Sequence, residues 1–194
     1  MEIPYARWYP QIAQRHSRRQ YDISRPIPSE VLDTLRRVCA DFKPFKGARV
    51  ELITDGPEKV FKGMLGSYGK VKGAGVYLAF IGNMSNPHAQ EMVGYTGEGL
   101  ILEASASGLG TCWVAGAFRP ESVAGSISIE KDEKVLAVSP VGYAGKSKTL
   151  EERLMSGFIK SNQRRPLGDL VTGEEETRWP SWLKIALEAA RLAP

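Results

Sequence analysis

The sequence has few of the residues from which metal sites and covalent cross-links are built. Its 194 residues include two cysteines and two histidines. Cys39 and Cys112 form no CxxC pair, and no cluster of His and Cys indicates a zinc site. Cys112 stands in an apolar run, so we expect it to be a buried free thiol. His16 and His88 are far apart in the sequence, and we expect no metal site.

Long apolar runs are also missing. No run approaches the roughly 20 residues that a membrane-spanning helix needs. Residues 1–16 lack the layout of a signal peptide. We therefore expect no membrane partner and a location in the reducing cytoplasm.

Positive charge is present only in small excess. The chain has 26 Lys and Arg residues against 22 Asp and Glu, a formal net charge of +4. That excess is too small to make nucleic acid the expected partner. It does favour a small anion wherever several of the cations converge.

The hydrophobic pattern predicts one domain of the α+β or α/β class. Strands are expected at residues 49–54, 76–83, 111–118 and 134–144, and helices at residues 29–42, 57–66, 86–106, 120–127, 149–159 and 180–194. The almost wholly apolar strand at 76–83 should be buried on both faces. The helix that ends before Gly108 is apolar or small on most sides, which predicts a central core helix.

Pro10 gives the start of a further helix near the N-terminus. Residues 3–15 have helical spacing of their apolar side chains. Proline is tolerated in a first helical turn and costly inside a helix. We therefore expect this helix to begin near Tyr9.

The stretch QRHSRRQYD, residues 14–22, concentrates basic side chains. Arg15, Ser17 and Arg19 suit a phosphate, because guanidinium groups offer a planar fork of donors that always carries charge. The alternative is a solvated helix end whose cations lie near the C-terminal dipole. We expect the chain to leave the helix after Ser17, since Ser and His are poor helix formers.

A second basic stretch, NQRRPL, lies at residues 162–167 and carries Arg164 and Arg165. Two separated Arg-rich turns beside an apolar core could close over one anion. They could equally be independent surface loops. The spacing alone leaves both interpretations open.

Five segments together resemble the flavin-dependent nitroreductase family. RHSRRQYD is similar to the R-[RH]-S-x-R-x-[FY] opening of that family, and the others follow in the family's order. They are SRPIPSEVLDTL, GYTGEGLILEASASGLGTCWVAGAF, VLAVSPVGYA and NQRRPLGDLV. The match spans residues 8–171, and the ordered set is more specific than any single segment.

This resemblance implies an α+β fold in which a mixed, mostly antiparallel sheet of four to five strands is wrapped by helices on both faces. It also implies a possible homodimer with FMN at the subunit interface. We accordingly divide the chain into a nitroreductase-like domain, residues 1–172, and an acidic linker with an amphipathic helix, residues 173–194. The apolar face of that helix should pack either into the core of the chain or against a second subunit.

The resemblance further implies the residues of the flavin site. The phosphate, ribityl chain or ring edge of FMN would be bound by Arg15, His16, Ser17 and Arg19. The same phosphate would be reached by Arg164 and Arg165, and the flavin would be lined by the backbone of Val114, Ala115 and Gly116. Arg18 would point to solvent. The flavin would carry electrons from NAD(P)H to a nitro, quinone or similar acceptor, and no catalytic side chain is demanded.

One family feature is missing from its usual place. A P-S-x-x-N-x-Q-P-W run should follow the first core helix, where this chain reads VCADFKPFKGARVELI. The last residues, ALEAARLAP, resemble the lead-in to that run, as in a divergent branch that places it after the RRP segment. The chain is therefore expected to be either truncated after Pro194 or degenerate. A flavin-binding module without turnover remains the alternative to an enzyme, and a weak nucleic-acid binder is a third hypothesis.

Overall fold

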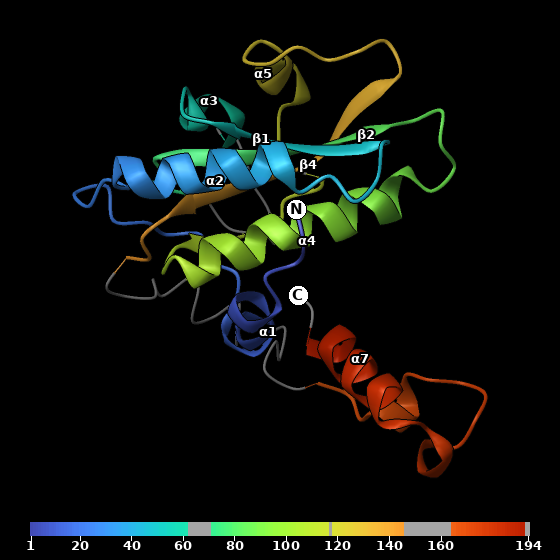
Figure 1. Ribbon diagram of the computed structural model, residues 1–194. Coiled ribbons are helices and arrows are strands. Elements are labelled where there is room, and N and C mark those ends of the chain that lie inside the picture. The colour runs from blue at the N-terminus through green and yellow to red at the C-terminus, as the bar shows by residue number, and fades with distance from the viewer. Residues whose placement is uncertain (62–70, 117, 146–163, 193–194) are drawn as a thin grey trace.

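The computed structural model describes residues 1–61, 71–116, 118–145 and 164–192. Within these ranges the chain forms one antiparallel sheet of four strands in the order β1-β2-β4-β3. The strands are β1 (Ala48–Ile53), β2 (Val76–Asn83), β3 (Gly110–Thr111) and β4 (Glu133–Gly142). The helices are α1 (Tyr5–Gln14), α2 (Ser29–Asp41), α3 (Pro57–Phe61), α4 (Ala89–Ala106), α5 (Pro120–Ala124) and α7 (Ser181–Leu192), with short 3-10 turns η1 (Leu167–Asp169) and η2 (Glu176–Arg178). The expected α+β class is confirmed (Figure 1).

The two faces of β2 are both covered. Side chains alternate between the faces of a strand. Val76, Leu78 and Phe80 join the core shared with α2 and α4. Tyr77 and Ala79 join a second core that α3 and α5 close from the opposite side (Figure 1). The predicted burial of this strand on both faces is confirmed.

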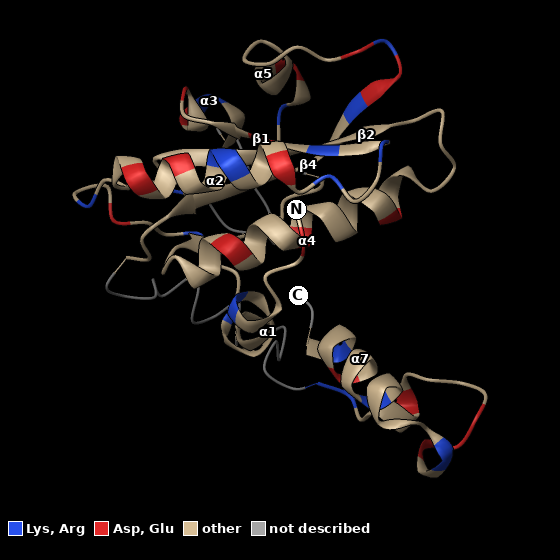
Figure 2. Ribbon diagram, viewed as in Figure 1, with Lys and Arg blue, Asp and Glu red and all other residues tan. Residues whose placement is uncertain are grey.

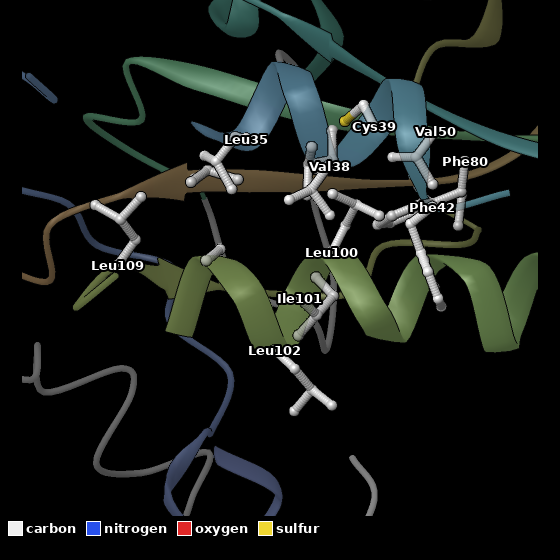
Figure 3. Close-up of a cluster of buried hydrophobic side chains, with 14 of the residues drawn as sticks. Leu35, Val38, Cys39, Phe42, Val50, Phe80, Leu100, Ile101, Leu102 and Leu109 are labelled. Atoms are coloured by element: carbon white, nitrogen blue, oxygen red, sulfur yellow. The ribbon is translucent and has the colours of Figure 1, made fainter. Parts of the chain in front are cut away.

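Helix α4 runs through the main core. Leu100, Ile101 and Ala104 have no exposed surface, and Figure 3 shows Leu100 directed toward α2 and Phe42. The helix contains no Lys or Arg and is mostly uncharged along its length (Figure 2). It stops before Gly108, whose φ of 75° suits a residue without a Cβ. The predicted central helix and its glycine stop are both confirmed.

Helix α1 begins earlier than the sequence predicts. Pro10 lies inside the helix and not in its first turn, so the expected start near Tyr9 is wrong. Contacts with α4 explain the difference. Two nitrogens of Arg7 donate hydrogen bonds to the carboxylate of Glu103 at 2.9–3.1 Å. Trp8 Nε1 donates to the same carboxylate at 2.7 Å. Several charge-assisted hydrogen bonds and a buried indole outweigh the roughly 3 kcal/mol that an internal proline costs.

Strand β3 is shorter than the strand expected at 111–118. It pairs with β4 only at Gly110 and Thr111. The N–H of Cys112 then donates to Ser139 Oγ at 3.1 Å instead of to a β4 carbonyl. A side-chain hydroxyl thus interrupts the ladder at Cys112, and pairing with β4 resumes only as an isolated bridge between Val114 and Val138.

Helix α7 lies beside α1, away from the sheet (Figure 1). None of its described residues is buried, and Trp182 and Ile185 are 67% and 49% exposed. The first alternative for this helix, packing into the core of the chain, is therefore not observed in the described residues. The helix expected at 149–159 lies outside those residues.

Loss of the Glu103 carboxylate should destabilise the protein strongly. Glu103→Ala leaves the buried indole N–H of Trp8 without an acceptor and Arg7 without its partner. We expect the free energy of unfolding to fall by about 2–4 kcal/mol, measured by urea denaturation followed by circular dichroism. Glu91→Ala removes an exposed carboxylate from the same helix and should change little. Equal effects of the two substitutions would refute the anchoring role of Glu103.

Candidate anion-binding site

The segment that follows α1 is extended and pinned to the sheet. The helix ends at Gln14, so the chain leaves it before Arg15 and not, as expected, after Ser17. Ser17 forms a parallel bridge with Thr111, whose carbonyl accepts the N–H of Arg18 at 2.7 Å. The basic stretch is therefore a neighbour of β3 and not a helix end.

Further along, the same segment lies between Lys72 and the end of β4. The N–H of Lys72 donates to the carbonyl of Arg19, and the N–H of Tyr21 donates to the carbonyl of Lys72, both at 2.9 Å. Tyr21 also pairs with Ala144, and its hydroxyl lies 3.2 Å from the carbonyl oxygen of Pro140. Backbone bonds on both sides thus fix the direction of the basic side chains.

Extended geometry divides these side chains between two sides. Alternate residues of an extended segment point in opposite directions, so Arg15, Ser17 and Arg19 share one side. His16 lies on the other, exposed, with Nδ1 3.1 Å from the carbonyl of Gln14. The three residues with the best donors for an anion are therefore grouped.

Three glycines make room for this segment. A Cβ on Gly110 would lie 2.9 Å from Cγ of Arg18, and a Cβ on Gly142 would lie 3.0 Å from Cδ1 of Tyr21. Gly73 has a φ of 76°, and a Cβ there would collide with the carbonyl oxygen of Tyr21. Arg18 is thus half-buried, with its aliphatic stem over Gly110.

The guanidinium of Arg15 is the unusual group of the segment. Its Nε and Nη2 atoms are buried and have no hydrogen-bond partner among the described residues. Burial lowers the pKa of Arg15, although an arginine remains charged at neutral pH. A buried donor left unpaired costs about 1–3 kcal/mol, and more when it is charged. An anion at this position would remove that cost.

The charge of Arg164, near the far end of the chain, acts on Arg15. Burial is the main reason for the lowered pKa of Arg15, and the charge of Arg164 lowers it further. Arg164 Nη2 donates to the carbonyl of Leu192 at 3.3 Å, which leaves other nitrogens of the fork available. Arg165 instead donates to the carbonyl of Asp169 at 3.3 Å. The charge of Arg164 thus acts on the pKa of Arg15, whereas Arg165 bonds within its own turn.

Residues 114–116, which are expected to line the flavin, are only partly exposed. Val114 is buried, and its N–H and C=O both bond to Val138 at 2.9 Å. Its backbone is thus already used. Ala115 and Gly116 are exposed, and a Cβ on Gly116 would meet nothing within 4 Å. Of the three residues, these two have an accessible backbone.

Sequence reasoning did not identify Glu98 and Trp113 as part of this region. Trp113 Nε1 donates to Glu98 Oε2 at 2.8 Å, and the charge of Glu98 raises the pKa of Arg15 against the larger effect of burial. The available signal was a carboxylate inside an otherwise apolar helix. A carboxylate in an apolar helix does not indicate which residue it bonds to, and Trp113 lies outside the helix that carries Glu98.

Other site types find no support in the described residues. They contain no group of three or more His, Cys, Asp or Glu residues arranged for a metal ion. Cys39 and Cys112 are buried and form no disulfide, and burial raises the pKa of Cys39 to about 12, which makes it a poor nucleophile. No helix in the described ranges combines the length and apolar character needed to cross a bilayer.

Comparison with protein families decides the relationship. The family model described as "Putative TM nitroreductase" matches residues 7–194, which is nearly the whole chain. The chain belongs to this nitroreductase family. The resemblance drawn from the five segments is thereby confirmed at the level of family. No curated protein matches the nitroreductase chain.

Solved structures show the same nitroreductase fold. A nitroreductase family protein from Clostridium difficile has a TM-score of 0.61 at 20% identity, over 90% of this chain and 99% of that one. A structure described as an oxidoreductase containing FMN has a TM-score of 0.65 at 19% identity, over 86% and 91% of the two chains. A protein from Bacteroides thetaiotaomicron described as "Putative NADH dehydrogenase/NAD(P)H nitroreductase" has a TM-score of 0.58 at 19% identity, over 72% and 88%. At these identities the likeness concerns the fold.

The glycine at position 73 should be essential to the position of the basic segment. Gly73→Ala places a Cβ against the Tyr21 carbonyl at a positive φ, which we expect to lower the free energy of unfolding by about 1–3 kcal/mol. Gly75→Ala is the matched control, because a Cβ there meets nothing within 4 Å. Guanidinium denaturation of both variants provides the measurement. If Gly73→Ala were as stable as Gly75→Ala, the close approach of the two segments would be wrong.

Proposed function

We propose that this protein is an FMN-dependent oxidoreductase that passes electrons from NAD(P)H to a nitro, quinone or similar small-molecule acceptor. The observation that carries the proposal is the buried, unpaired guanidinium of Arg15 beside the charge of Arg164. Two cations near each other, without a carboxylate ion pair among the described residues, fit a dianionic phosphate. Membership of a nitroreductase family and the fold shared with an FMN-containing oxidoreductase support the same cofactor.

The residues divide the work of holding FMN. Arg15, Arg19 and Arg164 would bind the phosphate, each through charge-assisted hydrogen bonds. The hydroxyl of Ser17 lies on the same side and would add a neutral donor. His16, Arg165 and Val114 would make only peripheral contacts with FMN. His16 is exposed, and Arg165 donates to the carbonyl of Asp169. The backbone of Val114 is already bonded to Val138.

The chain supplies position and environment for the reaction. Bound FMN would provide the redox chemistry, taking a hydride from the nicotinamide and delivering electrons to the acceptor. The exposed backbone of Ala115 and Gly116 would line the ring. No side chain of the chain is assigned as a catalytic acid or base. The nicotinamide donor is supported by the description of the related Bacteroides protein.

Arg15→Ala should weaken FMN binding more than any change at an exposed arginine. Loss of one charge-assisted phosphate contact costs about 1.5–3 kcal/mol, or roughly a 10- to 150-fold rise in Kd. Quenching of FMN fluorescence gives the Kd. Arg36→Ala, on the exposed face of α2, is the control and should bind as the wild type.

Two further results test the proposal as a whole. A yellow protein, or one that quenches added FMN, supports the cofactor. Oxidation of NADH or NADPH in the presence of a quinone or nitroaromatic then supports turnover. Binding without turnover would favour the alternative, a degenerate flavin-binding module that lacks the S-x-x-N-x-Q-P-W run. A protein that binds no FMN would overturn the proposed function.

We also propose that the protein is a homodimer and works in the cytoplasm. The stacked rings of Tyr5 and Tyr9 on α1 lie 5.2 Å apart and are exposed, as are Trp182 and Ile185 on the neighbouring α7. Exposed apolar surface of this kind is usual at subunit interfaces. Free cysteine thiols are the state expected in a reducing compartment.

Trp182→Asp should shift the protein from dimer toward monomer, because a charge would be buried at the interface. Sedimentation equilibrium measures the mass of both species. Met84→Asp changes an exposed apolar residue that lies on neither helix and should leave the mass unchanged. A wild type that sediments as a monomer at high concentration would refute the dimer.

A further inference from the structure

Glu98 carries a charge that its structural contact does not need. Trp113 Nε1 donates to Glu98 Oε2 at 2.8 Å, and the indole packs on Phe80 with ring centroids 4.2 Å apart. The indole also fills the space over Gly97, where a Cβ would lie 2.4 Å from the ring. A glutamine at position 98 would accept the same hydrogen bond with its amide oxygen. The packing of Trp113 therefore explains the oxygen of Glu98 but not its negative charge.

No cation among the described residues pairs with this charge. Glu98 forms no ion pair with a lysine or arginine there, and helix α4 itself contains no basic residue (Figure 2). Its second oxygen, Oε1, accepts no hydrogen bond in the described ranges and is not one of the buried atoms without a partner. Since Glu98 is only half-buried, Oε1 faces solvent with its charge uncompensated.

The backbone connects this carboxylate to the residues proposed to line the flavin ring. Trp113 precedes Ala115 by two residues, so their Cα atoms are at most about 7 Å apart. Ala115 and Gly116 are exposed, and none of residues 113–116 is charged. The carboxylate bonded to the Trp113 indole thus lies beside the ring end of the candidate site, which has no charge of its own.

We propose that Glu98 is a specificity-determining residue whose charge makes the site favour uncharged or cationic electron acceptors over anionic ones. The inference rests on the proposed function in one respect, that the acceptor reacts at a flavin lined by residues 115 and 116. A unit charge at a distance of about 10 Å changes a binding constant about 2-fold in water, and more where solvent is excluded. The indole of Trp113 fixes where that charge lies.

Three acceptors built on the same nitrobenzene ring test the effect of the charge. They are para-nitrobenzoate, para-nitrobenzamide and para-nitrobenzyltrimethylammonium, which are anionic, uncharged and cationic. At low salt, Glu98→Gln should raise kcat/KM at least about 2-fold for the anion and lower it at least about 2-fold for the cation, with the uncharged acceptor changing least. Both changes should shrink at high salt, because ions screen the charge. Packing alone does not produce two changes of opposite sign.

Glu91→Gln is the matched control. It removes an exposed carboxylate from the first turn of the same helix, about 10 Å further along the helix axis. It alters the net charge of the protein by the same amount, so an effect of net charge would appear in both variants. The order of the three acceptors should stay as in the wild type. Equal changes for all three acceptors in Glu98→Gln, or an unchanged order, would overturn the inference.

Collisional quenching of tryptophan fluorescence separates this inference from the proposed function, because it needs no turnover and no added FMN. Iodide, caesium and acrylamide are anionic, cationic and uncharged quenchers. Relative to the wild type, Glu98→Gln should show more quenching by iodide and less by caesium, with acrylamide changing least, because the charge lies on the indole of Trp113.

The two measurements have distinct outcomes. A wild type that reduces none of the three acceptors refutes the proposed function. Opposite changes in iodide and caesium quenching in such a protein would still support selection of small molecules by the charge of Glu98. If quenching by both ions is the same in Glu98→Gln and in the wild type, the charge does not act at this position and the inference fails.

Discussion

The buried carboxylate of Glu103 determines where the N-terminal part of the chain lies. It accepts hydrogen bonds from Arg7 and Trp8 and so fixes α1 on α4, the helix at the centre of the main core. The end of α1 leads into the basic segment, in which Ser17 forms a bridge with Thr111 of β3. A charge buried in the core is costly unless it is fully paired. Here the hydrogen bonds from Arg7 and Trp8 satisfy the carboxylate, and they also fix the position at which the basic segment begins.

Much of the fold was predictable because it depends on local patterns. The apolar run of β2 and the small, apolar α4 each indicated their burial, and Gly108 indicated the helix end. Failures occurred where distant contacts override local preference. Pro10 marks a helix start by propensity, but contacts with Glu103 extend the helix past it. The early end of β3 depends on a hydroxyl of β4 that no local pattern indicates.

The candidate site was predictable in a different way. Arg15 and Arg164 were indicated by two basic segments and by family resemblance, and the charge of Arg164 contributes to the lowered pKa of Arg15. The sequence could not show that Nε and Nη2 of Arg15 are buried without a partner among the described residues, since burial depends on the whole fold. It also could not show Glu98 beside Trp113, because their contact joins α4 to the chain after β3. Net charge was uninformative for the same reason: the site depends on a few converging cations and not on their total.

Gly110 and Gly142 set the alignment of the basic segment, residues 14–22, against the sheet. Gly110 faces Arg18 and Gly142 faces Tyr21, and both contacts exist only for one register of the segment against the sheet. A slip of one residue would turn every side chain to the opposite side. Arg15, Ser17 and Arg19 would then lie on the side that His16 occupies in this structure. The absence of a Cβ at these glycines therefore helps to determine which side of the segment faces the anion. The backbone hydrogen bonds of the segment act in the same direction.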